Sequence, residues 1–515
     1  MLKAHKSANF RKPPMDMSPQ QFQPLVTDPR KRLILFLFLL TAMFMATLDN
    51  QIVSTALPTI VGEFGELERF GWVGSAFLLA TSAVMPVYGK LGDLFGRKYV
   101  MIGAVTIFTI GSLLCGLAWS MDSLIAARVF QGLGGGGIMV SIFSVNADLF
   151  EPRERARYQS YSSLVIMASG TVGPTIGGTM SDLFGWRSIF LINLPIGIIV
   201  LAGLVMMLPN RRPSRQPKID YLGAVLLALA STTVVLLTDG ISLFGALFSW
   251  QSFTVLVIGI AAAVSWVLVE RRAPEPIIPL RLFKDSTFSL FLVVSLMTGG
   301  VAIGMVNYFA LFLQTTTGLS PTAAGLFFIA VTGGIVIGSL SAGRLISITG
   351  RYKPFVVTGL VMNVATLLIF SQLHAGSSLV LVALVMLMQG LSVGLGQQAP
   401  IIGVQNAVPR ADVGSATGAV TLTRMGGAAI AISVYGAVIT AFMHGVTVPG
   451  VENVTTLTPD QLAKLPDAAR LAVANAYAQA FEPMFLTAAG FAIIGLIAAL
   501  MLKPVRLPSL GERKS

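Results

Sequence analysis

Long runs of apolar residues alternate with short polar segments along almost the whole chain, from Leu33 to Leu502. The runs are about 18 residues or longer and nearly free of charge, which makes them long enough to cross a bilayer and too apolar for buried core helices. There are fourteen of them, at 33–60, 70–89, 98–118, 123–147, 160–181, 187–208, 220–238, 251–269, 286–313, 322–346, 355–373, 378–403, 415–442 and 482–502. The pattern predicts an all-α integral membrane protein with fourteen transmembrane helices.

Charged residues make up 11% of the 515 residues, against roughly 25% in soluble proteins, and the basic ones lie mainly in alternate loops. The amino-terminal tail and every second loop after it are basic, which by the positive-inside rule places both termini in the cytoplasm. These loops contain Lys90, Arg97, Lys98, Arg153, Arg155, Arg157, Arg351 and Lys353. The net charge of +12 therefore indicates topology, and we expect no nucleic-acid partner.

Two short sequence motifs of the first six spans recur in the last six spans. The loop after the second span matches the loop after the tenth, since Gly89, Lys90, Leu91, Gly96 and Arg97 recur as Gly343, Arg344, Leu345, Gly350 and Arg351. A second match pairs Gln131-Gly132-Leu133 with Gln389-Gly390-Leu391. Duplicated halves are typical of transporters, which place their substrate site near the midplane where the halves meet.

The repeat divides the chain into two six-span halves around a two-span insertion. The predicted units are a cytoplasmic basic tail (1–32), an N-terminal six-helix bundle (33–210), an inserted two-helix hairpin with its flanking loops (211–285), a C-terminal six-helix bundle (286–502) and a cytoplasmic tail (503–515). The second bundle includes a long outer loop, 443–481, which has a helix-compatible stretch from Pro459 to Ala480 and is either a small cap or a linker.

A carboxylate lies well inside the first span, at Asp49. Burying such a group costs roughly 2.5–3.5 kcal/mol at the centre of a membrane helix, so it needs a reason. Asp49 shares its helix face with Ala42, Ala46 and Val53, which suits a cavity wall better than a lipid surface. We therefore interpret it as a site of reversible proton loading. The alternative is a structural acid satisfied by a neighbouring polar group.

The fourth span opens with Arg128, which is followed by Gln131, Gly132 and a run of glycines from Gly134 to Gly137. The four-residue spacing of Arg128, Gly132 and Gly136 places the arginine on a face that allows close backbone approach. We expect it to face protein or a cavity, although a snorkelling arginine with a structural role is the alternative. Its counterpart in the second half is Met386, so the charge is retained on one side only.

The fifth span carries a glycine-rich motif with a proline inside it. Gly170, Gly173 and Gly177 line one face, with Gly178 beside them. Pro174 lacks an N–H, and its ring crowds the carbonyl group of Gly170. We therefore expect a kink or swivel there.

These motifs, together with the segment Trp186–Gly197 and the loop Gly89–Lys98, resemble the major facilitator superfamily, and within it the fourteen-spanner drug/proton antiporter branch (EmrB/QacA-type multidrug exporters). The resemblance extends over roughly residues 33–503. It implies two six-helix bundles with an inserted hairpin. It also implies that Arg128 takes part in proton handling with Asp49, and that the motif of the fifth span is the one associated with exporters.

The resemblance also gives the first basic loop a role. It implies that Gly89, Asp93 and Arg97 form a conformational latch with Asp148, which closes the halves together in one state. One feature departs from some multidrug members of the family, because no acid lies inside spans 9 to 14 to bind a dication, Glu482 being the end residue of span 14. Candidates for the substrate cavity are Asn50, Gln131, Asn307 and Gln314.

The sequence shows no P-loop, metal-ligand cluster or nucleophile triad, so we expect a protein that is not an enzyme and needs no cofactor or metal. We predict a proton-coupled antiporter of a bacterial plasma (inner) membrane that exports cationic or lipophilic drug-like compounds by alternating access. Its expected partners are that small molecule, protons, membrane lipid and, unproven, an envelope adaptor. The alternatives are a dedicated exporter of one endogenous metabolite, siderophore or lipid-like, and a non-transporting membrane sensor or scaffold.

Overall fold

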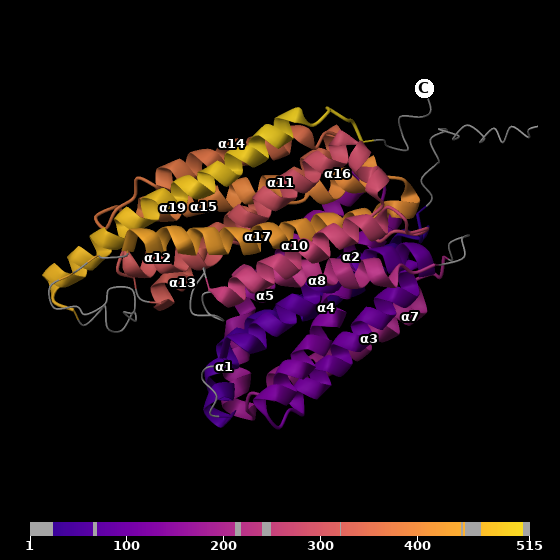
Figure 1. Ribbon diagram of the computed structural model, residues 1–515, viewed down its shortest axis with the longest axis horizontal. Helices are drawn as coiled ribbons and strands as arrows, with labels where there is room; N and C mark the ends of the chain where they lie inside the picture. The colour runs from indigo at the N-terminus through magenta and orange to yellow at the C-terminus, as the bar shows by residue number, and fades with distance from the viewer. Residues whose placement is uncertain are drawn as a thin grey trace, which may run out of the picture.

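The computed structural model describes residues 24–64, 70–211, 218–238, 249–319, 321–443, 446, 448 and 465–507. Within these ranges the chain is almost entirely helical and contains no β-strand (Figure 1). The predicted all-α fold is therefore confirmed. Many large apolar side chains on the outer helix faces are exposed, as a bilayer-facing surface requires because lipid is as apolar as they are.

The first bundle comprises the helices α1 (Pro29–Phe64), α2 (Phe70–Phe95), α3 (Arg97–Gly116), α4 (Met121–Leu149), α5 (Pro152–Phe184), α6 (Ser188–Leu191) and α7 (Asn193–Met207). Helix α4 packs against α2 and α3, while α1 packs against α5 and α7 (Figure 1). The glycine run makes the α4 contacts close. A Cβ added at Gly134 would lie 2.3 Å from the backbone nitrogen of Phe108 on α3, and one added at Gly136 would lie 2.3 Å from the carbonyl oxygen of Thr81 on α2.

The inserted hairpin consists of α8 (Tyr221–Thr238) and α10 (Trp250–Glu270). The two helices pack against each other, and α8 also packs against α2 of the first bundle and α17 of the second (Figure 1). Most of α10 is exposed, which suits a helix surrounded by lipid on several sides. The hairpin therefore lies alongside the junction of the bundles.

The second bundle comprises α11 (Ser286–Ala302), α12 (Val306–Thr315), α13 (Pro321–Thr349), α14 (Lys353–Phe370), α15 (Leu379–Gly396), α16 (Ala399–Ala407), α17 (Val413–Met443) and α19 (Asp467–Met501), with the short 3₁₀ helices η2 (Leu280–Lys284) and η3 (Arg410–Asp412). Helix α15 packs against α13 and α14, and α11 packs against α17 and α19. This arrangement parallels that of the first bundle, as the sequence repeat predicts.

Eleven helices of the described chain are long and apolar enough to cross a membrane. The other three predicted spans fall on α5, on the shorter α8, and on α11 with α12, so the count of fourteen remains a prediction. One boundary differs from expectation. The helix-compatible stretch in the outer loop 443–481 is continuous with the last span from Asp467 onward, because α19 begins there and runs unbroken to Met501; residues 459–464 of the stretch lie outside the described residues.

The two bundles meet mainly through two pairs of helices, α2 with α17 and α5 with α13. The hydrogen bonds and close backbone contacts between these pairs lie toward the end of the molecule that carries Lys98, Arg153 and Arg351, which we call the basic face (right in Figure 1). There the Ser163 hydroxyl donates a hydrogen bond of 3.0 Å to Ser339 across the junction. The described parts of the bundles are therefore closed together on this face.

Candidate functional site

A buried ion pair lies inside the first bundle. Arg128 Nη1 of α4 donates to Asp49 Oδ2 of α1 over 2.6 Å, and both side chains have no exposed surface. The other carboxylate oxygen, Oδ1, accepts hydrogen bonds of 2.8 Å from Gln131 Nε2 and 2.8 Å from Asn193 Nδ2. Three donors from α4 and α7 thus converge on the buried carboxyl group of Asp49.

Arg128 is held by a backbone carbonyl group, an amide and an aromatic ring in addition to Asp49. Its Nε donates to the carbonyl oxygen of Val73 over 3.1 Å, and its Nη1 also donates to Gln131 Oε1 over 2.6 Å. The guanidinium carbon lies 4.2 Å from the centre of the Phe77 ring, a cation–π distance. Arg128 therefore lies in the protein interior, as expected, and does not snorkel to a membrane surface.

Two further members of this cluster were missed in the sequence. Ser112 of α3 accepts hydrogen bonds from Gln131 Nε2 at 2.7 Å and from Asn193 Nδ2 at 3.2 Å. Asn193 is an amide at the start of an apolar helix, inside a segment already notable for its resemblance, and that signal was available. A serine in an apolar span is too common to single out. The cluster thus joins α1, α3, α4 and α7.

The cluster also has spare hydrogen-bonding capacity. Arg128 Nη2 and Asn193 Oδ1 are buried and make no hydrogen bond to the described residues. Buried polar atoms are normally paired, so one unpaired donor and one unpaired acceptor are unusual beside an ion pair. They would allow the hydrogen bonds of the cluster to rearrange when its charge changes.

The predicted latch residues meet at the basic face. Arg97 Nη2 donates to Asp93 Oδ1 over 2.6 Å, and Arg97 Nε donates to Asp148 Oδ2 over 3.2 Å. Asp93 also accepts the backbone N–H groups of Gly414 at 2.9 Å and Ser415 at 2.8 Å, at the start of α17. The bond between the bundles is therefore a carboxylate on a helix N-terminus, where unpaired N–H groups and the helix dipole favour an anion.

Gly89 allows this contact to form. A Cβ added at Gly89 would lie 2.2 Å from the carbonyl oxygen of Gly414, so α2 and α17 cross with their backbones touching. Gly343, its repeat partner, meets α5 in the same way, with an added Cβ 2.6 Å from Ser160 Oγ and 2.8 Å from the carbonyl oxygen of Ala156. The repeated glycines, which lie on α2 and α13, thus make equivalent contacts on the two sides of the junction.

The motif of the fifth span lies against the helix that carries Asp49. A Cβ added at Gly173 would lie 2.7 Å from Gln51 Cβ, and one added at Gly170 would lie 3.4 Å from Gln51 Nε2. Gly177 is buried, whereas a Cβ at Gly178 would meet no atom within 4 Å. The side chain of Pro174 lies outside the described residues, and α5 runs through this position as one helix, so the kink remains a prediction.

The four cavity candidates are not brought together. Gln131 belongs to the buried cluster, whereas Asn50 is partly buried and takes no part in the hydrogen bonds to Asp49. Gln314 is partly buried on α12 of the second bundle. The side chain of Asn307 lies outside the described residues.

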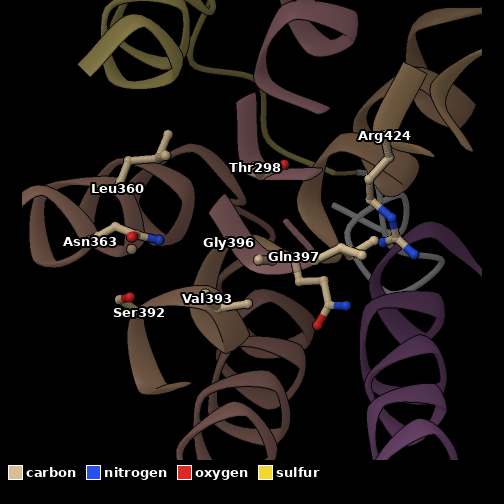
Figure 2. Close-up of a pocket in the computed structure, with 11 residues that line it drawn as sticks. Thr298, Leu360, Asn363, Ser392, Val393, Gly396, Gln397 and Arg424 are labelled. Carbon is tan, nitrogen blue, oxygen red and sulfur yellow. The ribbon is translucent and has the colours of Figure 1, made fainter. Parts of the chain in front are cut away.

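A small pocket lies inside the second bundle, between α11, α14, α15 and α17 (Figure 2). Its volume of about 20 Å³ is enough for roughly one water molecule. Its polar lining includes Asn363, Gln397 and Arg424, and Figure 2 shows the guanidinium group of Arg424 directed toward the side of the pocket that holds Gln397. Arg424 was missed in the sequence, although a lone arginine within the predicted span 415–442 was a visible signal.

Known proteins resemble this chain over most of its length. The family model of the Major Facilitator Superfamily matches residues 39–432. An uncharacterized MFS-type transporter of Mycobacterium tuberculosis is 34% identical over 502 residues, which are 95% of this chain and 72% of the relative. The multidrug transporter protein MdtP of Bacillus subtilis is 31% identical over 414 residues, covering 80% of this chain and 76% of the relative.

Among solved structures, the human organic anion transporter MFSD10 superposes with a TM-score of 0.61 at 14% identity, covering 90% of this chain and 100% of its own. At that identity the likeness concerns the fold alone. The apolar helices, the duplicated bundles and the match over residues 39–432 agree with one another. The chain is thus a multi-pass membrane protein that belongs to the Major Facilitator Superfamily, a family of transporters and not of enzymes.

Proposed function

We propose that this protein is a proton-coupled antiporter that exports lipophilic, drug-like compounds by alternating access between its two bundles. The observation that supports this best is the occluded pair of Asp49 and Arg128, with 0% exposure of both side chains. A charged pair inside a membrane helix bundle is costly to bury and is often less favourable than a well-packed apolar pair of similar size. Its presence is therefore better explained by a change of charge during the working cycle.

A proton would act on the packing of the first bundle. In the described state the charged carboxylate attracts Arg128 of α4 and accepts from Asn193 of α7. A neutral carboxyl group loses the attraction to the guanidinium, and its remaining hydrogen bonds are weaker than those of a carboxylate. Proton binding therefore loosens α1 from α4 and α7, and proton release tightens them. The proton shifts the equilibrium between two states because it binds them with different affinities.

The described state is closed on the basic face. Asp93 holds α17, Ser163 contacts Ser339, and Arg155 Nη1 donates to Gln405 Oε1 over 3.3 Å between the bundles. If the basic face is cytoplasmic, as the positive-inside rule predicts, this is the state that opens outward. Opening toward the cytoplasm would require these bonds to break, and the latch then sets the energy difference between the two states.

The nature of the substrate is proposed partly from relatives. MdtP is named as a multidrug transporter, and another relative at 30% identity is named Multidrug resistance protein 3, both in Bacillus subtilis. A lipophilic substrate suits the apolar walls of the bundles. The expected preference for cations has less support, since Asp49 is already paired with Arg128 and none of the eleven described residues lining the second-bundle pocket is acidic.

The membrane, the orientation and the energy source are part of the same proposal. We place the protein in a bacterial plasma membrane with both termini in the cytoplasm, surrounded by lipid and driven by the proton gradient without a cofactor. Each proton that moves through 100 mV supplies about 2.3 kcal/mol, so one or two protons per cycle sustain uphill export. An envelope adaptor on the outer loop remains a prediction, because residues 449–464 of that loop lie outside the described residues.

The test measures proton movement in proteoliposomes that hold an imposed pH gradient and are challenged with cationic dyes, biocides and neutral lipophiles. The native chain should release protons when a substrate is added. Asp49→Asn should abolish this response, because its side chain cannot exchange a proton. Asp182→Asn is the matched control, since Asp182 is an exposed acid on α5, and it should respond like the native chain.

Full proton-driven export by Asp49→Asn would refute the assignment of Asp49. Silence of the native chain across the panel would favour a dedicated exporter of one endogenous metabolite, siderophore or lipid-like. A correctly inserted native chain that also gave no flux with such metabolites would favour a membrane sensor or scaffold.

A further inference from the structure

Arg424 occupies an unusual position for a positive charge. It lies on α17, ten residues after Gly414, which places it about 15 Å along the helix from the basic face and near the middle of a 31-residue helix. Its guanidinium group lines the pocket that is also formed by α11, α14 and α15 (Figure 2). Helix α17 packs against α2 and α4 of the first bundle. The charge therefore lies inside the second bundle and near the junction.

No negative charge of the described protein neutralises this arginine. Its Nε is buried without a hydrogen-bond partner among the described residues, and none of the eleven residues that line the pocket is acidic. Arg128 in the first bundle differs, because a carboxylate, an amide and a backbone carbonyl all accept from it. Charges inside membrane bundles are normally paired, so an unpaired guanidinium in a pocket lacks its anion.

The other groups around the pocket limit what that anion can be. The side-chain oxygen of Gln397 is also buried without a partner among the described residues, and its amide can turn to present its N–H₂ group instead. Ala302, Ile303, Leu360 and Val393 provide an apolar wall. The two parallel N–H groups of a guanidinium can donate to both oxygens of a carboxylate. The apolar wall suits a ligand whose carboxylate is attached to a hydrocarbon or aromatic group.

We propose that Arg424 binds the carboxylate of an amphiphilic anion, so that the substrates of this exporter include lipophilic carboxylates. The pocket takes the head of the ligand. At about 20 Å³ it has room for roughly one water molecule in the described state, and neighbouring side chains move aside when the carboxylate enters. That such ligands are transported rests on the function proposed above, whereas their binding at Arg424 does not.

The experiment compares two fluorescent probes that share one apolar body, pyrenebutyrate with a carboxylate and pyrenebutanol with a neutral hydroxyl group. Both are titrated at pH 7 into the full-length protein in lipid nanodiscs. The native protein should bind the carboxylate at least about tenfold more tightly than the alcohol, since a charge-assisted pair with arginine is the added interaction. Equal affinity for the two probes, or no binding of either, would overturn the proposal without any need for a variant.

Variants then locate the binding. Arg424→Gln should remove the preference for the carboxylate and leave the affinity for the alcohol unchanged. Arg424→Lys should retain part of it, because lysine keeps the charge and loses the fork. Arg344→Gln is the control and should behave like the native chain, since Arg344 is exposed near the end of α13, in the segment that repeats the first basic loop. A preference that persists in Arg424→Gln would show that the carboxylate binds elsewhere and would overturn the assignment to this residue.

Proton measurements separate this proposal from the proposed function. In Asp49→Asn the carboxylate should still bind in an Arg424-dependent way, although proton-coupled export is lost. Arg424-dependent binding without any proton movement in the native chain would refute the antiporter and support the anion site. Proton-coupled export of neutral compounds by a native chain with no preference for the carboxylate would support the antiporter and refute the anion site.

Discussion

The two bundles contain a similar cluster of amide and hydroxyl side chains, but only the cluster of the first bundle includes an ion pair. In the first bundle Gln131 of α4 bonds Ser112 of α3, and both lie in the cluster around Asp49 and Arg128. In the second bundle Gln389 of α15 contacts Thr366 of α14 and donates to Asn363 over 2.9 Å. Here the arginine is replaced by Met386, which is fully buried. The amide scaffold is thus common to both halves, whereas the ion pair belongs to the first.

The difference indicates a division of labour. The first bundle buries a positive charge together with its own acid, which suits an exchange of protons. The second bundle has a positive charge, Arg424, which lines a pocket together with Asn363 of the amide cluster, and none of the residues lining that pocket is acidic. An uncompensated charge is unfavourable for stability alone, so its retention is better explained by a ligand. Duplication would thus have left one half to handle protons and the other to recognise substrate.

The strongest way to break the comparison is to make the first bundle resemble the second. Arg128→Met copies Met386 and leaves Asp49 buried without its cation, which should destabilise the protein by about 3–5 kcal/mol and abolish proton coupling. Thermal unfolding in detergent measures the first effect and proteoliposome pH changes measure the second. Asp49→Asn combined with Arg128→Met should recover much of the stability but not the coupling. Coupling that survives in the double variant would contradict a proton role for this pair.

A smaller effect compares the two repeated loops at the junction. Gly89→Ala would push a Cβ against the backbone of Gly414, whereas Gly343→Ala would meet the movable hydroxyl group of Ser160 as well as backbone. We expect Gly89→Ala to destabilise the state closed on the basic face, relative to the open state, by about 1–3 kcal/mol, and Gly343→Ala to destabilise it less. Labelling of a cysteine introduced at the basic face reports the open fraction. Equal labelling of the two variants would show that the junction does not distinguish its two sides.

The smallest expected effect is on stability, at the end of the first bundle that lies away from the basic face. Trp186 Nε1 and Arg187 donate to Glu63 at 2.6 and 2.8 Å, and these hydrogen bonds hold the pKa of the Glu63 carboxyl below its ordinary value. Because the folded pKa is lowered, the stabilisation is present above the unfolded value of 4.5 and is lost as the pH falls through the folded one. The native chain should therefore be more stable than Glu63→Gln at pH 7 by at most about 1 kcal/mol, since the pair is exposed.

Thermal unfolding at pH 7 and again below pH 4 tests this, and the difference between the two proteins should shrink on acidification. A difference that stays constant with pH would mean that the carboxylate form of Glu63 contributes nothing to the stability of this end.

Much of the fold was predictable because it rests on local patterns. Apolar length predicts the membrane helices, and the matching loops at Gly89 and Gly343 predict the duplication. Errors came where a pattern has no sharp end. The outer stretch before the last span could not be separated from that span by hydropathy, and the structure joins the part from Asp467 onward to the span in α19. The proline motif of α5 predicts a kink that remains untested.

The candidate site was predictable in part. Asp49 and Arg128 stand out because a charge in an apolar run is rare, and the resemblance joined Asp93 to Arg97 and Asp148. Asn193 and Ser112 did not stand out, since neutral polar residues are common in membrane helices. That Asp93 would accept from the first N–H groups of α17 depends on the approach of two helices far apart in sequence.

The sequence by itself determined that this is a multi-pass helical membrane protein of duplicated halves with a buried acid and a buried arginine, because hydrophobic length and charge are properties of each segment alone. The tertiary structure decided which donors satisfy Asp49, what Asp93 holds, and that Arg424 lacks an acid in its pocket. These are questions of distance between helices, and the strength of a hydrogen bond or an ion pair falls steeply with distance. A chain shows which charges must be buried, and only the packing of its helices shows which of them find a partner.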